Sequence, residues 1–158
     1  MIADEREQLT GFLDHQRATV VWKASGLTDE QARRSLLPSE LTTVAGLVPH
    51  LRLNEEYWFG TVVGGAPDAW DEILKEDPDA EFRLGLEHPL DALIADYQAE
   101  CARSRETLAG HELDEVVSLP SGRELTVRWV VIHMIEETAR HAGHLDLIRE
   151  LTDGLTGE

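Results

Sequence analysis

Four long stretches of helical spacing constrain the fold of this sequence more than any other feature. Apolar residues recur every three or four positions over about 4–23, 42–63, 88–109 and 126–151. This is the pattern of amphipathic helices that bury one face against each other. Because no segment shows a strong strand pattern, the spacing predicts an all-α four-helix bundle, formed by 1–158 as a single domain.

The boundaries of the second helix follow from residues that start and stop helices. Either Thr42 or Thr43 can cap its beginning, and Gly64 with Gly65 ends it. Pro49 lies inside this helix. A proline there removes one backbone hydrogen bond, and because the apolar spacing continues past it, we expect a bend rather than a break.

Two of the connections between the predicted helices have recognisable sequence patterns. The segment 65–87 is a long acidic connection between the second and third helices, and we predict a short helix near 69–74 with Trp70 as the anchor. A connection of this length in a compact domain usually covers a site or packs against a neighbour. The segment 113–125 predicts an extended piece and a tight turn at Leu119-Pro120-Ser121-Gly122.

The net charge of the chain limits the classes of partner that it is expected to bind. There are 14 Lys and Arg against 31 Asp and Glu, which gives a formal net charge of −17. Nucleic acid and anionic membranes are polyanions, so we expect neither as a partner.

The single cysteine, Cys101, excludes an intramolecular disulfide. With no targeting segment and no apolar run of membrane-helix length, the expected location is the cytoplasm.

The last predicted helix carries metal-binding residue types on one stripe. At about 100° per residue, His133, His141 and His144 all lie within about 40° of Glu137. The stripe adjoins the apolar face, so these side chains point toward the bundle interior or its mouth. Glu137 and His141 are one turn apart and can therefore approach one divalent ion.

A third ligand must come from another helix, and His50, among apolar residues of the second helix, is the best candidate. Two histidines and one carboxylate with open positions form catalytic Zn²⁺ and non-haem Fe²⁺ sites. Two plainer interpretations stay open. Each histidine can be a hydrogen-bonded structural residue, and the stripe can be a solvated face. Cys101 lies on an apolar face, which favours a core residue over a catalytic thiol.

The segment 131–150, VIHMIEETARHAGHLDLIRE, resembles the signature of an actinobacterial branch of the DinB-like family. The segments 5–17 and 46–51 resemble its first and second helices, so the resemblance covers essentially the whole chain. It implies a four-helix bundle of the DinB/YfiT-like type, similar to the metal-binding domain of mycothiol-dependent maleylpyruvate isomerase.

Site residues are also implied by this resemblance. His50, Glu137 and His141 match the family's metal ligands. His144 stands where many relatives have Gln, so it is either an additional ligand or a catalytic acid/base, and His133 is a lower-ranked partner beside the site. Pro49, directly before His50, departs from the family pattern and puts the aim of that side chain in question.

Characterised members of the family use a metal to activate a low-molecular-weight thiol such as mycothiol or bacillithiol. The resemblance therefore implies a thiol-dependent S-transferase or isomerase that acts on a small molecule. The expected metal is Zn²⁺, with Ni²⁺ or Fe²⁺ as alternatives. A non-catalytic bundle that binds a metal or another ligand is the competing hypothesis, and a homodimer through exposed helix faces is compatible with both.

Overall fold

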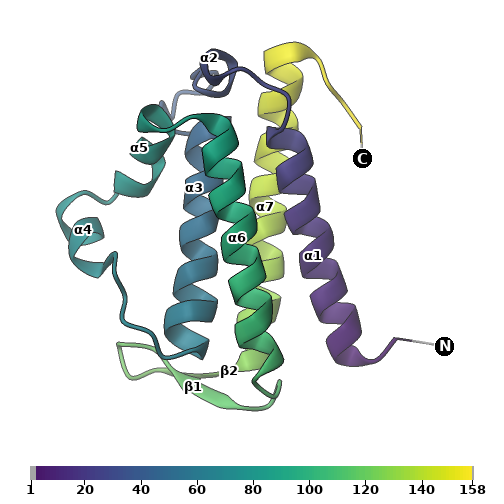
Figure 1. Cartoon of the computed structure of the whole chain (residues 1–158), viewed down its shortest axis with the longest axis vertical. Coiled ribbons are helices and arrows are strands. Elements are labelled where there is room, and N and C mark those ends of the chain that lie inside the picture. The colour runs from purple at the N-terminus through teal and green to yellow at the C-terminus, as the bar shows by residue number, and fades with distance from the viewer. Residues whose placement is uncertain (1–2, 158) are drawn as a thin grey trace.

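The computed structural model describes residues 3–157 as a bundle of four long helices, which confirms the predicted all-α fold. Figure 1 shows the four helices side by side along the long axis of the molecule. They are α1 (Glu5–Ala24), α3 (Val44–Glu55) with its π-helical continuation η1 (Glu56–Val63), α6 (Leu90–Ala109) and α7 (Val127–Asp153).

Three of the four long helices begin at residues whose side chains accept hydrogen bonds from free backbone N–H groups of the first turn. Asp4 caps α1 in a capping box with Glu7, and the hydroxyl of Thr43 accepts from Gly46 N at the start of α3. Thr126 caps α7 in the same way through Trp129 N. These are the positions where side-chain oxygens are expected to stabilise a helix start. A further short helix, α2 (Asp29–Ala32), opens at the capping box that begins at Thr28.

Helix α3 runs through Pro49 without a break, as the sequence predicts. Pro49 has no N–H to donate to the carbonyl of Ala45, which lies one turn earlier. After Glu55 the helix widens into the π-helical segment η1, which the sequence did not predict. The second long helix is therefore continuous to Val63, but its last turns are wider than those of an α-helix.

The acidic connection lies on the outside of the bundle and holds two short helices. The first, α4 (Asp71–Glu76), is close to the helix predicted near 69–74, whereas the second, α5 (Ala80–Glu87), was not predicted. Figure 1 shows α4 and α5 beside α3, on the side away from α1. The connection therefore covers the outer face of α3.

A two-stranded antiparallel hairpin closes one end of the bundle, between α6 and α7 (Figure 1). It consists of β1 (Val116–Ser118) and β2 (Glu124–Thr126), with Val117 opposite Leu125. The extended piece and turn predicted for 113–125 are confirmed. Gly122 takes a positive φ of 83°, a conformation that costs glycine little.

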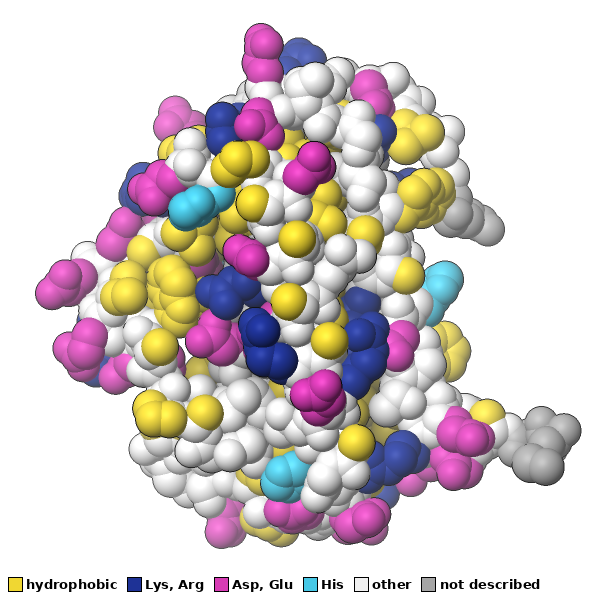
Figure 2. Space-filling view, in the orientation of Figure 1, with side chains coloured by type: hydrophobic (Ala, Val, Ile, Leu, Met, Phe, Trp, Pro, Cys, Tyr) yellow, Lys and Arg dark blue, Asp and Glu magenta, His cyan; other side chains and the backbone are white. Residues whose placement is uncertain are grey.

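The core consists of two clusters of buried apolar side chains, one toward each end of the bundle. Cys101 belongs to one of them and is 3% exposed, which confirms its predicted place in the core. A buried ion pair between Arg17 of α1 and Glu55 of α3 lies between the helices. Figure 2 shows Asp and Glu spread around the rim of one face, with hydrophobic side chains gathered beside α4.

None of the described helices is both long enough and apolar enough to cross a membrane.

Candidate metal centre

Three predicted ligand residues meet between α3 and α7. Glu137 and His141 lie one turn apart on α7, and His50 faces them from α3. The Nε2 atom of His50 is 3.1 Å from Nε2 of His141 and 3.3 Å from Oε1 of Glu137. The remaining pair, His141 Nε2 and Glu137 Oε1, is 3.1 Å apart. The three atoms therefore form a nearly equilateral triangle.

The size of this triangle suits a divalent ion. Ligand atoms about 2.0–2.2 Å from a tetrahedral ion lie about 3.3–3.6 Å from each other, and those on one face of an octahedral ion lie about 3.0 Å apart. The three distances fall between these values. Imidazole nitrogens and a carboxylate are also the donor types that Zn²⁺, Ni²⁺ and Fe²⁺ accept. Among the residues that the structure describes, this is the group of His, Cys, Asp and Glu side chains that could hold a metal.

His50 is held in place by two residues of α5 that the sequence analysis missed. Its Nδ1 atom is 2.6 Å from Oε1 of Glu81, and its ring stacks on Phe82 with centroids 4.7 Å apart. Glu81 is one of many acidic residues in the connection, and nothing in its local sequence distinguishes it. The general expectation that a connection of this length covers a site was the only available signal.

The charges in this cluster stabilise each other. Hydrogen bonds from His141 and then His50 hold the pKa of Glu137 far below its usual range, against the opposing effect of burial. Burial alone would lower the pKa of His50, but its bonds to Glu137 and Glu81 outweigh this and raise it to about 9. Two carboxylates thus face the imidazole of His50, which makes this cluster attractive to a cation.

The structure separates the other two histidines of the stripe from the triangle. His144 is exposed, and its Nδ1 atom lies 3.3 Å from Nδ1 of His141, on the side of that ring opposite Nε2. His133 stacks on Trp129 with centroids 5.1 Å apart and contacts Trp58 edge-on. His144 is therefore a neighbour of one candidate ligand, and His133 belongs to an aromatic cluster beside the site.

The family model described as Mycothiol-S-transferase matches residues 8–154. The chain belongs to the mycothiol-S-transferase family. This is a DinB-like family, so the resemblance seen in the sequence is confirmed. No curated protein matches the chain.

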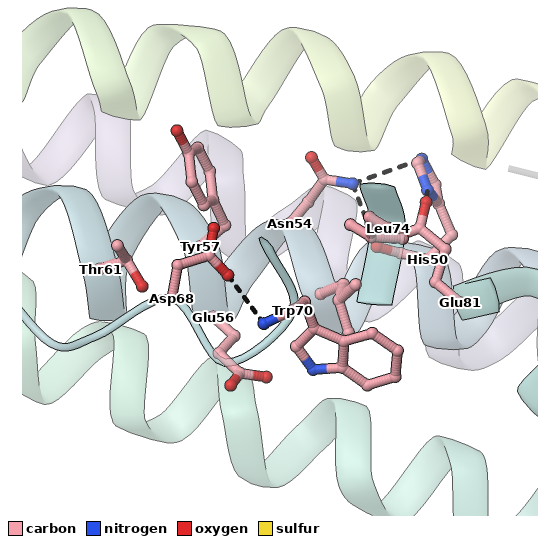
Figure 3. Close-up of a pocket in the computed structure, with 10 residues that line it drawn as sticks. His50, Asn54, Glu56, Tyr57, Thr61, Asp68, Trp70, Leu74 and Glu81 are labelled. Carbon is pink, nitrogen blue, oxygen red and sulfur yellow. Dashed lines mark hydrogen bonds and ion pairs between the residues drawn. The ribbon is translucent and has the colours of Figure 1, made fainter. Parts of the chain in front are cut away.

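In this member of the mycothiol-S-transferase family, His50 also lines a pocket of about 300 Å³, whereas Glu137 and His141 do not line it. Figure 3 shows His50 and Glu81 at one end of it and Thr61 at the other. Its lining mixes apolar and aromatic side chains with hydrogen-bonding groups, namely Leu53, Asn54, Glu56, Tyr57, Asp68, Trp70 and Leu74. A polar small molecule can therefore lie next to His50.

The walls of the pocket come from α3, η1 and the acidic connection. Asn54, one turn after His50, contacts both Nε2 and the backbone carbonyl of that residue. Trp70, the predicted anchor of the connection, lies near the guanidinium of Arg52, 5.9 Å from the ring centroid. Asp68 accepts a hydrogen bond from Trp70 N and so fixes the start of α4 (Figure 3). The connection thus builds the outer wall of the pocket.

Proposed function

We propose that the chain is a metal-dependent thiol S-transferase. In this proposal His50, Glu137 and His141 hold one divalent ion, with Zn²⁺ as the first choice. The sulfur of a low-molecular-weight thiol of the mycothiol type would form a bond to a carbon atom of a small electrophile, as the leaving group of the electrophile departs and the thiol proton passes to solvent. The observation that carries the proposal is the triangle of ligand atoms, 3.1–3.3 Å on each side, next to an open pocket. The family match favours transfer over the isomerase alternative.

The ion would supply one chemical effect. A divalent metal with an open position binds a thiolate and lowers the pKa of the thiol, which yields a strong nucleophile at neutral pH. The residues of the chain would place the reactants. Three protein ligands would leave at least one position open, and the pocket of about 300 Å³ that begins at His50 would give one of the reactants room next to it.

The thiol in this proposal comes from a cofactor rather than from the protein. Cys101 is buried in the core, and burial followed by the charge of Glu55 raises the pKa of its thiol to about 12. A thiol of this kind is almost entirely protonated at neutral pH and is a poor nucleophile. The thiol of the single cysteine is therefore not expected to compete with the cofactor thiol for the electrophile.

His144 stays a candidate catalytic residue in this scheme. Its contact is with Nδ1 of His141, whereas the thiol would approach the other side of that ring. This geometry supports a role in positioning His141. Direct proton transfer to or from the substrate would require His144 to turn toward the pocket.

The proposal is tested by metal analysis together with a conjugation assay. The wild-type protein, expressed and purified without an affinity metal, is incubated with Zn²⁺, mycothiol and monochlorobimane as a fluorogenic electrophile. We expect one bound ion per chain and metal-dependent conjugation. Both should be lost in His50→Ala and His141→Ala, while His15→Ala, which changes an exposed histidine of α1, should retain both.

Two results would contradict the proposal. Full metal occupancy in His50→Ala would remove that residue from the ligand set. Metal binding by the wild type without conjugation, for several thiols and electrophiles, would favour the alternative of a non-catalytic binding protein. The open pocket beside His50 is what makes catalysis the preferred interpretation, since a non-catalytic site needs no space next to the ion.

A further inference from the structure

Two residues of helix α5 contact the imidazole of His50, one at its Nδ1 atom and one on the face of its ring. Oε1 of Glu81 lies 2.6 Å from Nδ1, and the ring of Phe82 stacks on the imidazole face at an interplanar angle of 16°. The side chain of Glu81 is only 12% exposed. A short contact between a largely buried carboxylate and an imidazole is a strong hydrogen bond, because water competes poorly for either partner.

The position of α5 is fixed by direct contact of its backbone with α3. Gly85, one turn after Glu81, lies so close to Ala45 that an added Cβ would meet the carbonyl oxygen of Ala45 at 2.4 Å. This carbonyl is the one to which Pro49 cannot donate. The guanidinium of Arg33 donates to the carbonyl of Gly85 at 2.9 Å and holds the same turn from outside.

We propose that Glu81 is a positioning residue of the metal centre, and that docking of α5 on α3 and binding of the metal stabilise each other. This inference rests on the proposed metal site. Because Glu81 belongs to the acidic connection, a segment outside the four-helix bundle completes that site.

The hydrogen bond determines which nitrogen of His50 is free. If Nδ1–H donates to Glu81, the lone pair of Nε2 points toward Glu137 and His141, where the ion would lie. A carboxylate behind a histidine ligand orients the ring and makes it a stronger donor, and removing such a partner typically costs about 10–100-fold in metal affinity. Phe82 prevents the ring from turning out of this plane.

The coupling between docking of α5 and binding of the metal must work in both directions. If docked α5 raises the affinity for the ion by some factor, the ion favours docked α5 by the same factor. Since Glu81 also lines the pocket, the arrangement that binds the ion is the one that builds the pocket wall.

The test compares Glu81→Ala and Glu81→Gln with Glu87→Ala, an exposed glutamate on the same helix. Zn²⁺ affinity is measured on the full chain by competition with a chromophoric chelator. We expect Glu81→Ala to bind Zn²⁺ about 10–100-fold more weakly than the wild type. The Zn²⁺ affinity of Glu81→Gln, which keeps a neutral acceptor, should lie between those of Glu81→Ala and the wild type. The affinity of Glu87→Ala should match that of the wild type.

Hydrogen exchange of the backbone amides in 80–87 provides a second readout that does not depend on activity. Zn²⁺ should slow exchange in this segment of the wild type and have a much smaller effect in Glu81→Ala. Gly85→Ala forces α5 away from α3, so it should weaken Zn²⁺ binding even though every ligand is present. A purely structural role for Glu81 would lower thermal stability without changing the affinity.

The outcomes distinguish this inference from the proposed function. If the wild type binds Zn²⁺ and conjugates thiols but Glu81→Ala binds Zn²⁺ equally tightly, the role of Glu81 is wrong and the proposed function stands. If the wild type binds Zn²⁺ without conjugation and Glu81→Ala binds it weakly, only the proposed activity is wrong. If the wild type binds no divalent ion, both are overturned.

Discussion

The Nε2 atoms of His50 and His141 face each other at 3.1 Å, although the two residues are 91 positions apart in the chain. Two imidazole nitrogens at this distance repel if both carry a lone pair or both carry a proton. They must therefore share one proton or bind a common cation. Glu137, 3.1–3.3 Å from both, adds the negative charge that such a cation needs.

The first prediction concerns stabilisation by metal. At a free Zn²⁺ concentration 100 times the dissociation constant, binding should stabilise the folded state by about 2.7 kcal/mol. For a domain of this size that corresponds to a rise in Tm of roughly 5–10 °C. Thermal denaturation with and without Zn²⁺ measures it. His141→Ala should abolish the shift and His111→Ala, remote on the hairpin side, should keep it. An equal shift in both variants would place the ion elsewhere.

The second prediction concerns the buried ion pair between Arg17 and Glu55. Two hydrogen bonds of 2.8 and 2.6 Å join the guanidinium to the carboxylate, and both side chains are almost fully buried. Glu55→Gln leaves the charge of Arg17 with only the half-exposed Asp14 as a partner. We expect a loss of about 3 kcal/mol in the free energy of unfolding, measured by urea denaturation.

A matched control for this prediction is Asp71→Asn, which removes a partner of the exposed Lys75. Its urea midpoint should not change, because exposed ion pairs contribute little. A comparable loss in both variants would show that burial of the Arg17–Glu55 pair is not the cause.

The third prediction is a loss of stability at high pH that originates at Cys101. Burial, then the charge of Glu55, raises the pKa of this thiol from 9.0 to about 12. Because the folded value lies above the unfolded one, the contribution is complete below pH 9 and is lost as the pH rises from 9 toward 12. Cys101→Ala removes it, so the difference between wild type and variant should shrink above pH 9 by about 1.4 kcal/mol per pH unit.

Urea denaturation between pH 7 and 10.5 checks this dependence. Burial also raises the pKa of the neighbouring Tyr97 well above its ordinary value, so the variant should still lose some stability in the same range. A difference between wild type and variant that stays constant up to pH 10.5 would contradict the prediction.

The fourth prediction separates two roles of His144. His144→Ala should retain the metal and lower kcat at least about tenfold, because His141 loses its neighbour at Nδ1. His144→Gln should restore most of the rate if His144 acts by positioning, since an amide can keep the hydrogen bond but cannot transfer a proton. A glutamine variant as slow as the alanine variant would instead support the acid/base role.

Local sequence signals were sufficient for the long helices. Thr43, one of the two predicted caps of the second helix, caps α3, and α7 begins directly after Thr126, where the fourth helix was predicted to start. Helix α3 continues through Pro49 as the apolar spacing indicates. These features depend on contacts within a few residues of the chain, which a sequence displays directly. The π-helical segment η1 and helix α5 were not predicted, because the packing of neighbouring elements decides between helix types and holds short helices together.

The candidate site likewise has one part that was predictable from the sequence and one part that depends on tertiary packing. Glu137 and His141 share a helix face through their spacing alone, and this was visible in the sequence. The apolar surroundings of His50 and the family resemblance indicated it as their partner. Its distance to them is a property of how α3 packs against α7.

The sequence by itself determined an all-α bundle, because helical periodicity and caps are local, and it determined which residue types could bind a metal. The tertiary structure alone decided that Glu81 and Phe82 hold His50, and that a pocket opens beside this histidine. These relationships depend on the docking of α5 against α3. That docking depends on Gly85 lying against the carbonyl of Ala45, a contact between positions far apart in the chain that no local pattern records.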